Sequence, residues 1–196
     1  MNPIENTRRV KPVELVMVLE DLSGPACFPL PPGYSYRGFR QGDEELWVRI
    51  ETSAGEFASA DGANQHFRRE FGQHQLELCD RCLFVERENG EPVGTAMAWY
   101  GTLLPGGAAG RLHWLGIRKE YQGRGIGKPL VSQAMKLLSS RHDRAYLTTH
   151  SKSLAAIKIY LDFGFLPYIR EEIERKEWVE IAKHLGMTDM EIGSNF

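Results

Sequence analysis

Residues 111–140 read RLHWLGIRKEYQGRGIGKPLVSQAMKLLSS, and three structural elements follow one another in this stretch. Leu112–Ile117 is apolar enough for a buried strand. Glu120–Gly127 is a turn with three glycines and basic side chains, and from Ile126 onward apolar residues repeat at helical spacing. Glycines let backbone amides approach a ligand closely, and the N–H groups and dipole of a helix start favour phosphate. The stretch therefore predicts an anion-binding unit of strand, loop and helix.

The length and composition indicate one soluble domain. The chain has 196 residues, which is enough for one self-sufficient core. A net charge of -2 argues against nucleic acid as a partner, and no apolar run reaches the ~20 residues of a membrane span. Three cysteines, an odd number, do not suggest a disulfide framework, so we expect a cytoplasmic protein. The oligomeric state is left open, with a homodimer as one alternative.

The rest of the chain yields a coarse order of elements. Residues 1–33 are rich in proline and are expected to form an extended segment over the domain, with a strand or short helix only at 13–19. Asn89-Gly90 predicts a hairpin with a type I′ turn. The other expected elements are a strand at 34–40, a helix carrying Leu46, Trp47 and Ile50, a helix at about 62–78, hairpin strands at 83–88 and 93–100, a strand at 145–149, a helix at 153–163 and a charged helix at 170–185.

Two motifs make the chain similar to a known family. The first is Gln122-x-x-Gly125-x-Gly127 between the strand and the helix described above, and the second is Ala156–Phe165, AIKIYLDFGF, which fits A-x-x-x-Y-x-x-x-G-F. In this order they resemble the GCN5-related N-acetyltransferase superfamily over about 34–168. The resemblance implies an α/β fold in a single domain, with a mixed, mostly antiparallel twisted sheet flanked by helices. We therefore divide the chain into an extended segment at 1–33, the acetyltransferase domain at 34–168 and a charged helical segment at 169–196.

The resemblance also implies acetyl-CoA as the acyl donor. Its pyrophosphate is expected on the loop, where backbone N–H groups and two basic side chains can bind anionic oxygens. The residues of this loop are Gln122, Gly123, Arg124, Gly125, Ile126, Gly127 and Lys128. The pantetheine arm of the family pairs with the preceding strand at a bulge, which corresponds here to Leu115, Gly116 and Ile117. Glycine suits a bulge, although Gly116 could instead make room for a neighbour such as Trp99.

The implied reaction is attack of an amine on a thioester carbonyl, which requires an acid and a base. Tyr160 holds the position of the family's general acid, and the alternative is an aromatic residue of the core. His113 is the candidate base on the strand, and a partly buried histidine without a catalytic role is the alternative. Strand alternation places His113 and Trp114 on opposite faces, apart from any shift at the bulge. The carboxylates of Glu51, Glu56 and Asp61 could instead attract and deprotonate the acceptor, or belong to a solvated helix face.

Three features need separate interpretation. Ser153 stands where the family often has an asparagine that helps to hold the cofactor, so it is a candidate contact that could also cap its helix. The helix expected at 170–185 replaces the two strands with which the family usually ends. Cys79-x-x-Cys82 lacks a second pair of ligands, and we therefore predict no metal site.

The sequence as a whole predicts an acetyl-CoA-dependent N-acetyltransferase. The acceptor is an amine on a small metabolite, a peptide N-terminus or a protein lysine, and no nucleic acid or membrane partner is expected. The alternative is a catalytically silent module of the same fold that binds acyl-CoA as a sensor or for interactions with other proteins.

Overall fold

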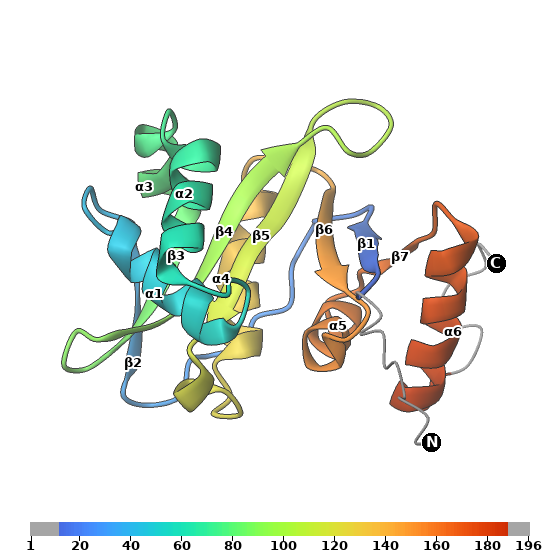
Figure 1. The fold of residues 1–196 in the computed structure, drawn as a ribbon. Coiled ribbons are helices and arrows are strands. Elements are labelled where there is room, and N and C mark those ends of the chain that lie inside the picture. Colours follow the sequence, from blue (N-terminus) through green and yellow to red (C-terminus); the bar gives the residue numbers. More distant parts are fainter. Residues whose placement is uncertain (1–11, 188–196) are drawn as a thin grey trace, which may run out of the picture. The chain divides into compact units, whose positions relative to one another are not determined.

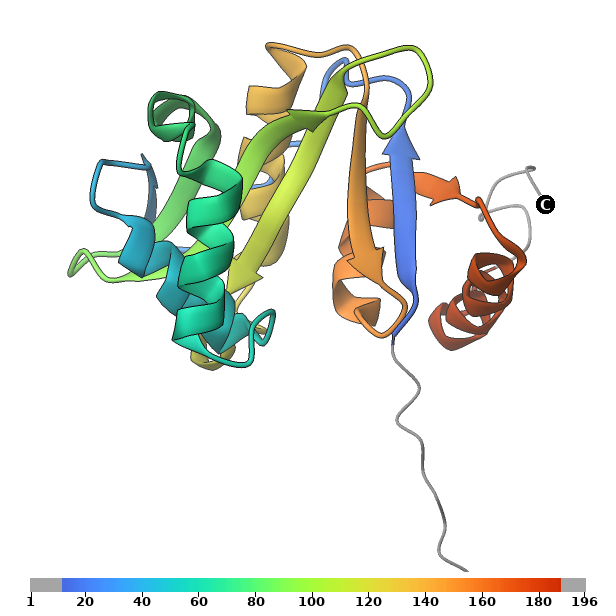
Figure 2. The same ribbon diagram turned by 45° about the horizontal axis from the view of Figure 1, so that its top comes forward.

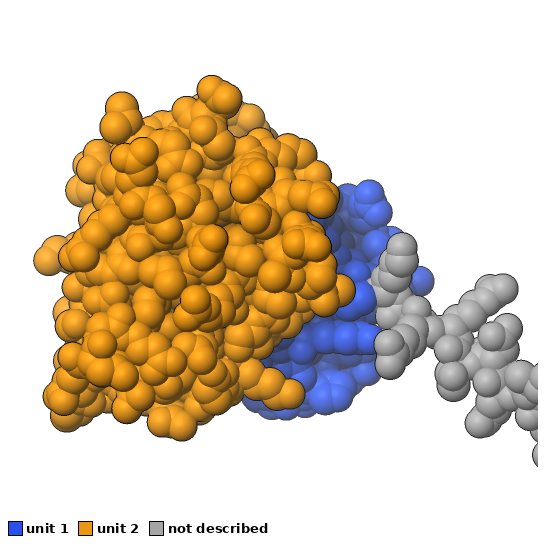
Figure 3. Space-filling view, turned by 60° about the vertical axis from the view of Figure 1, so that its left-hand side comes forward, with its two compact units in different colours: residues 1–17, 148–196 blue, residues 18–147 orange. Residues whose placement is uncertain are grey.

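The computed structural model describes residues 12–187, and the chain divides into two compact units (Figure 3). Unit 2 is Val18–Leu147, and unit 1 contains the described residues before Val18 and from Thr148 onward. None of the helices within residues 12–187 is long and apolar enough to cross a membrane.

Unit 2 contains a sheet with the strand order β2-β3-β4-β5-β6. The strands are β2 (Tyr34–Gly38), β3 (Cys82–Arg87), β4 (Pro92–Gly101), β5 (Ala109–Ile117) and β6 (Ala145–His150), whose first residues belong to this unit. Neighbours from β2 to β5 pair antiparallel, whereas β6 runs parallel to β5. The predicted α/β fold with a mixed, mostly antiparallel sheet is confirmed.

Helices cover both faces of this sheet. They are α1 (Glu44–Ala54), α2 (Ala60–Phe71), α3 (Gln75–Arg81), the short 3-10 helix η1 (Lys119–Tyr121) and α4 (Gly127–Ser139). Figure 1 and Figure 2 show α1 and α2 on one side of β4 and β5, and α4 on the other side. The two faces of β4 therefore pack against different helices.

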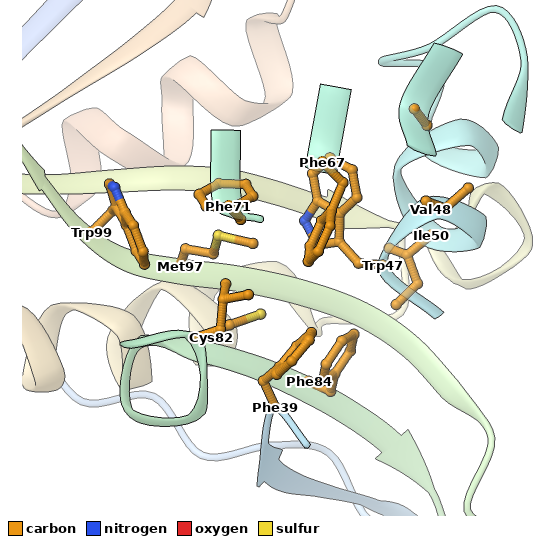
Figure 4. Close-up of a cluster of buried hydrophobic side chains, with 12 residues drawn as sticks. Phe39, Trp47, Val48, Ile50, Phe67, Phe71, Cys82, Phe84, Met97 and Trp99 are labelled. Atoms are coloured by element: carbon orange, nitrogen blue, oxygen red, sulfur yellow. The ribbon is translucent and has the colours of Figure 1, made fainter. Parts of the chain in front are cut away.

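The core between α1, α2 and the sheet is rich in aromatic residues (Figure 4). Trp47 from α1 and Phe67 and Phe71 from α2 are fully or almost fully buried, and they face Met97 and Trp99 of β4. Each such side chain contributes about 1.5–3 kcal/mol by leaving water. This core holds α1 and α2 firmly against β4 and β5, so polar residues on the same helix faces also point toward the sheet.

Residues 22–33 run beside α4, and we call them the α4 strap. The backbone N–H of Phe28 donates to Ser132 Oγ over 3.0 Å, and that hydroxyl donates to the Ala26 carbonyl over 2.9 Å. Leu22 N–H donates to the Asp143 carbonyl over 2.8 Å. After the strap, the Tyr36 hydroxyl of β2 donates to the Pro129 carbonyl in the first turn of α4 over 2.7 Å. The segment expected to be extended therefore fixes the start of α4.

Two local predictions in unit 2 are wrong. The single helix expected at 62–78 is two helices, because the chain turns after Phe71 and the N–H of His74 bonds to the Phe71 carbonyl. Gly72 follows Phe71, and glycine is a weak helix former. The β3–β4 hairpin exists, but its turn is not type I′, which needs positive φ at both central residues. Only Gly90 has positive φ, 78°, and the N–H of Arg87 bonds to the Glu91 carbonyl to close a longer loop.

Unit 1 has the strand order β6-β1-β7. Its elements are most of β1 (Glu14–Leu19), the end of β6, α5 (Leu154–Asp162), β7 (Leu166–Tyr168) and α6 (Glu172–Leu185). Helix α6 confirms the charged helix expected at 170–185. The predicted domain limits at 33 and 168 stay predictions, and residues 1–11 and 188–196 lie outside the described residues.

Candidate functional site

The central irregularity of unit 2 is a bulge in β5. Met97 pairs with His113 and Thr95 with Gly116, so two residues of β5, Trp114 and Leu115, oppose one residue of β4. Trp114 is the one non-glycine residue within 12–187 that has a positive φ, 45°. A large side chain in that conformation is costly and persists only where the surroundings hold it. The bulge was expected at Leu115, Gly116 and Ile117, and it begins one residue earlier.

The bulge brings His113 and Trp114 to the same carboxylate. Strand alternation would place their side chains on opposite faces, but both hydrogen-bond to Glu70 of α2. His113 Nε2 lies 2.6 Å from Glu70 Oε1, and Trp114 Nε1 lies 3.0 Å from Oε2. His66, one turn before Glu70 on α2, places Nε2 2.8 Å from the same Oε2. Three donors thus converge on one carboxylate beside the bulge.

These contacts decide the charge of Glu70. Burial alone would raise its pKa, but the hydrogen bonds from His113, Trp114 and His66 outweigh burial and lower the pKa to about 2. Glu70 is therefore ionised at neutral pH and acts only as an acceptor. No sequence motif marks Glu70, although its spacing of four residues from His66 is that of a helix-surface pair.

His113 is held in its neutral form. Burial lowers its pKa to about 4, and the contact with Glu70 only partly counteracts that effect. Because an ionised carboxylate can only accept, the neutral imidazole carries its hydrogen on Nε2. The side chain is therefore well oriented beside the bulge but is a weak proton acceptor at neutral pH.

Glu51 of α1 lies against Gly116, the residue of β5 that follows the bulge. Its side chain is completely buried, and neither carboxylate oxygen has a hydrogen-bond partner among the described residues. A Cβ atom placed on Gly116 would lie 2.6 Å from Glu51 Oε1 and 2.9 Å from Oε2. Burial, with a smaller contribution from Glu56, raises the pKa of Glu51 well above its ordinary value. Of the three predicted carboxylates, only Glu51 is brought to β5 in this way, whereas Glu56 and Asp61 are exposed.

Two glycines of the loop after β5 adopt positive φ angles, a conformation that favours glycine. Gly123 and Gly125 have φ values of 72° and 77°, and the residues from Gln122 to Gly125 are exposed. Ile126 caps α4, whose helical residues begin at Gly127, and no acidic residue occurs in its first turn. The first N–H groups of a helix lack acceptors within the helix and carry partial positive charge. The loop can therefore offer backbone donors to an anion.

The side chains of the loop have other contacts. Gln122 Nε2 donates to the Ile117 carbonyl over 2.9 Å, which ties the loop to the end of β5. The Arg124 guanidinium lies 5.0 Å from the ring centre of Tyr121, and Lys128 Nζ lies 5.3 Å from that of Phe28 in the α4 strap. The Gln122 side chain therefore holds the loop in shape. The backbone N–H groups of the loop and the side chains of Arg124 and Lys128 remain the candidate anion ligands.

Tyr160 and Ser153 lie in unit 1. Tyr160 on α5 is 6% exposed, and its ring centre lies 6.2 Å from that of Phe165. Ser153 precedes α5 at the N-cap position, but its side chain makes no capping hydrogen bond, so the expected cap is absent. The roles predicted for both residues continue to rest on the motif.

The two cysteines of the Cys-x-x-Cys sequence differ in their surroundings. Cys79 is exposed on α3, whereas Cys82 is buried at the start of β3 with Sγ 3.6 Å from Thr95 Oγ1. Burial raises the pKa of the Cys82 thiol to about 12, which makes it unreactive at neutral pH. Within residues 12–187, no group of three or more His, Cys, Asp or Glu side chains could hold a metal ion.

A comparison of the sequence with models of protein families finds a match that includes the bulged strand, the glycine loop and the start of α4. The sequence model of the Acetyltransferase (GNAT) family matches residues 44–165, more than half of the chain. The chain belongs to this family of acetyltransferases.

Two curated relatives have names that are more specific than the family name, but their sequences are distant from this chain. Mycothiol acetyltransferase of Beutenbergia cavernae is 26% identical over 142 residues, which cover 71% of this chain and 47% of the relative. Mycothiol acetyltransferase of Salinispora arenicola is 27% identical over 151 residues, with 70% and 46% covered. The chain therefore spans about half the length of the curated relatives it matches.

Solved structures show the same fold at lower identity. A GCN5-related N-acetyltransferase from Sphaerobacter thermophilus has a TM-score of 0.62 at 21% identity, over 81% of this chain and 50% of that chain. A protein from Pyrococcus horikoshii OT3 has a TM-score of 0.60 at 19% identity, over 71% and 93%. These similarities support the fold assignment.

Proposed function

We propose that the protein transfers the acetyl group of acetyl-CoA directly to an amine of a small molecule. The observation that carries this proposal is the bulge at Trp114, followed directly by the glycine loop and the start of α4, in a chain of the acetyltransferase family. A bulge leaves backbone groups of β5 outside the ladder, where an extended pantetheine arm can bind. The loop that follows is suited to the pyrophosphate.

The donor site divides into two parts in this proposal. Leu115, Gly116 and Ile117 bind the pantetheine arm through their backbone, and the loop from Gln122 to Lys128 binds the pyrophosphate. Gln122 supports the loop through its bond to the Ile117 carbonyl, and Arg124 and Lys128 supply positive charge. Ser153 is proposed as a weaker contact to the cofactor.

Two polar side chains complete the proposed chemistry. Tyr160 donates a proton to the departing thiolate, a role that rests on its place in the A-x-x-x-Y-x-x-x-G-F motif. His113, oriented by Glu70, lies next to the bulge and provides a hydrogen-bonding group for the reactants. The curated relatives are acetyltransferases named for mycothiol, which supports a small-molecule acceptor rather than a protein one.

The test is release of CoA thiol from acetyl-CoA in the presence of a broad panel of amines, with acetyl-CoA binding measured separately by calorimetry. We expect binding and turnover with at least one amine. Saturable binding without turnover across the panel would instead indicate the sensor alternative, and absence of binding would reject both.

A further inference from the structure

The α4 strap lies against the glycine loop as well as against α4. Lys128 Nζ is 5.3 Å from the ring centre of Phe28, and both residues are partly buried. A Cβ atom placed on Gly125 would lie 3.6 Å from Pro31 Cγ, so the proline ring borders the loop at this glycine. Gly125 and Lys128 both belong to the loop that is proposed to bind the pyrophosphate. The strap therefore contacts the proposed donor site at two of its residues.

We infer that the α4 strap is part of the donor site, and that Phe28 is a positioning residue that holds the Lys128 ammonium group where the pyrophosphate of acetyl-CoA binds. The inference rests on the proposed acetyltransferase function, and it adds a residue from outside the strand, loop and helix that carry the other donor-site residues of unit 2. Phe28 acts through Lys128 and not on the reacting atoms.

Two hydrogen bonds to one buried hydroxyl group of α4 fix the backbone around Phe28. The Phe28 N–H donates to Ser132 Oγ over 3.0 Å, and this hydroxyl donates to the Ala26 carbonyl over 2.9 Å. Ser132 is 6% exposed and follows Lys128 by four residues, a spacing that places both side chains on one face of the helix. The ring is therefore anchored to the helix face that carries Lys128.

The chain is fixed to the first turn of α4 again after the strap. The Tyr36 hydroxyl donates to the Pro129 carbonyl over 2.7 Å. Burial, with a smaller contribution from Cys27, raises the pKa of Tyr36 to about 12, so this hydroxyl keeps its proton and remains a donor at neutral pH. The stretch from Phe28 to Tyr36 is thus anchored to α4 at both ends, at Ser132 and at Pro129.

An ordered Lys128 binds an anion at a lower entropic cost. A lysine side chain has many rotamers, and fixing them at the moment of binding lowers the affinity. The face of an aromatic ring attracts an ammonium group, so Phe28 restricts Lys128 before the ligand arrives. The ammonium has three donors, which allows it to bind phosphate oxygens beside the ring. Because coupling between two equilibria is reciprocal, bound acetyl-CoA should in turn stabilise the strap.

The experiment measures acetyl-CoA binding by calorimetry, which requires no acceptor. Phe28→Leu keeps an apolar side chain but removes the aromatic face, and it should raise Kd by about 2- to 30-fold, the range that cation–π contacts span. Phe28→Tyr keeps the ring and should bind as the wild type does. In a Lys128→Met background, Phe28→Leu should change Kd by less than about 2-fold, because the ring has lost its partner.

Several results would overturn the role of Phe28. Equal weakening in both backgrounds would mean that the ring supports the fold and does not act through Lys128. Unchanged or tighter binding in Phe28→Leu, or the same loss in Phe28→Tyr, would also contradict it. If the wild-type protein does not bind acetyl-CoA, the proposed function itself fails, which is a separate outcome.

A second measurement follows the strap directly. The Phe28 amide hydrogen exchanges with solvent only when its bond to Ser132 opens, so its exchange rate reports the opening of the strap. Saturating acetyl-CoA should slow this exchange in the wild type but not in Lys128→Met. The control is the His74 amide between α2 and α3, which bonds to the Phe71 carbonyl over 2.8 Å and should be unaffected. Unchanged exchange at Phe28, or equal slowing at His74, would separate the strap from the donor site.

Discussion

The carboxyl group of Glu51 occupies the space that a side chain at position 116 would need. A Cβ on Gly116 would lie 2.6 Å from Glu51 Oε1 and 2.8 Å from Cδ, and the completely buried Glu51 has no room to withdraw. Gly116 and Glu51 are therefore coupled, although they lie on different elements far apart in the sequence.

The first prediction tests this coupling. Gly116→Ala should lower the free energy of unfolding by about 1–3 kcal/mol, because it overpacks the contact with Glu51. In a Glu51→Ala background the same substitution should be better tolerated, with a coupling energy of about 0.5–3 kcal/mol. Urea unfolding of the two single variants and the double variant measures it. Strictly additive effects would mean that the two residues do not compete for space.

The second prediction concerns stability against pH. Folding raises the pKa of Glu51 above its ordinary value of 4.5, so the folded state binds the extra proton. Stability from this group is complete below pH 4.5 and is lost as pH rises toward the folded pKa, by at most about 1.4 kcal/mol per pH unit. Glu51→Gln should therefore gain Tm relative to wild type as pH rises from 5 to 8. A constant difference in Tm over that range would contradict the raised pKa.

The third prediction concerns Glu70 as a positioning residue for His113 and Trp114. Glu70→Gln should destabilise the fold by about 1–3 kcal/mol, since charge-assisted bonds to a buried partner are lost. We expect lower kcat with little change in the affinity for acetyl-CoA, together with a changed near-ultraviolet dichroism from Trp114. The control is Glu77→Gln on α3, whose carboxylate accepts from His74 and Tyr100. If Glu77→Gln lowers kcat equally, the effect of Glu70 is not specific.

The fourth prediction separates backbone strain from ligand binding in the glycine loop. Gly123 and Gly90 have φ values of 72° and 78°, and a Cβ on either would meet nothing within 4 Å. Alanine at either position should cost about 1 kcal/mol of stability through strain alone. Only Gly123→Ala should also weaken acetyl-CoA binding, because only that loop is proposed to hold the pyrophosphate. Equal affinity in both variants would remove the loop from the donor site.

The fifth prediction concerns Tyr160. Tyr160→Phe keeps the ring and its packing against Phe165 but removes the hydroxyl group. We expect kcat to fall by about 10²-fold or more while KM for acetyl-CoA stays within a few-fold, since proton donation acts in the transition state. Steady-state kinetics over pH 6–9 provides the measurement. An unchanged kcat at every pH would remove Tyr160 from the mechanism.

The sequence was most informative where local pattern determines structure. The strand, glycine loop and helix between Leu112 and Ser139 were all predicted, because apolar spacing and glycine conformations are local properties. The position of the bulge was missed by one residue, since it depends on how β5 pairs with β4. Glu70 was missed altogether, because its bond to His113 joins residues 43 positions apart.

The burial of Glu51 is partly predictable from the sequence. A carboxylate on an amphipathic helix is usually solvated, which was the competing interpretation of Glu51. Yet Glu51 follows the fully buried Trp47 by four residues, a spacing that places both on one helix face. The pattern could therefore have indicated burial, but not that the carboxyl group would lack a partner.

The α4 strap has a practical consequence for how this protein is cut into fragments. The segment that identifies the family, residues 44–165, contains Ser132 and Pro129 but not Ala26, Phe28 and Tyr36, their hydrogen-bonding partners. A fragment trimmed to 44–165 would also lack β2, and so expose the edge of β3. The part of the chain that suffices for recognition by sequence is therefore shorter than the part that supports the start of α4.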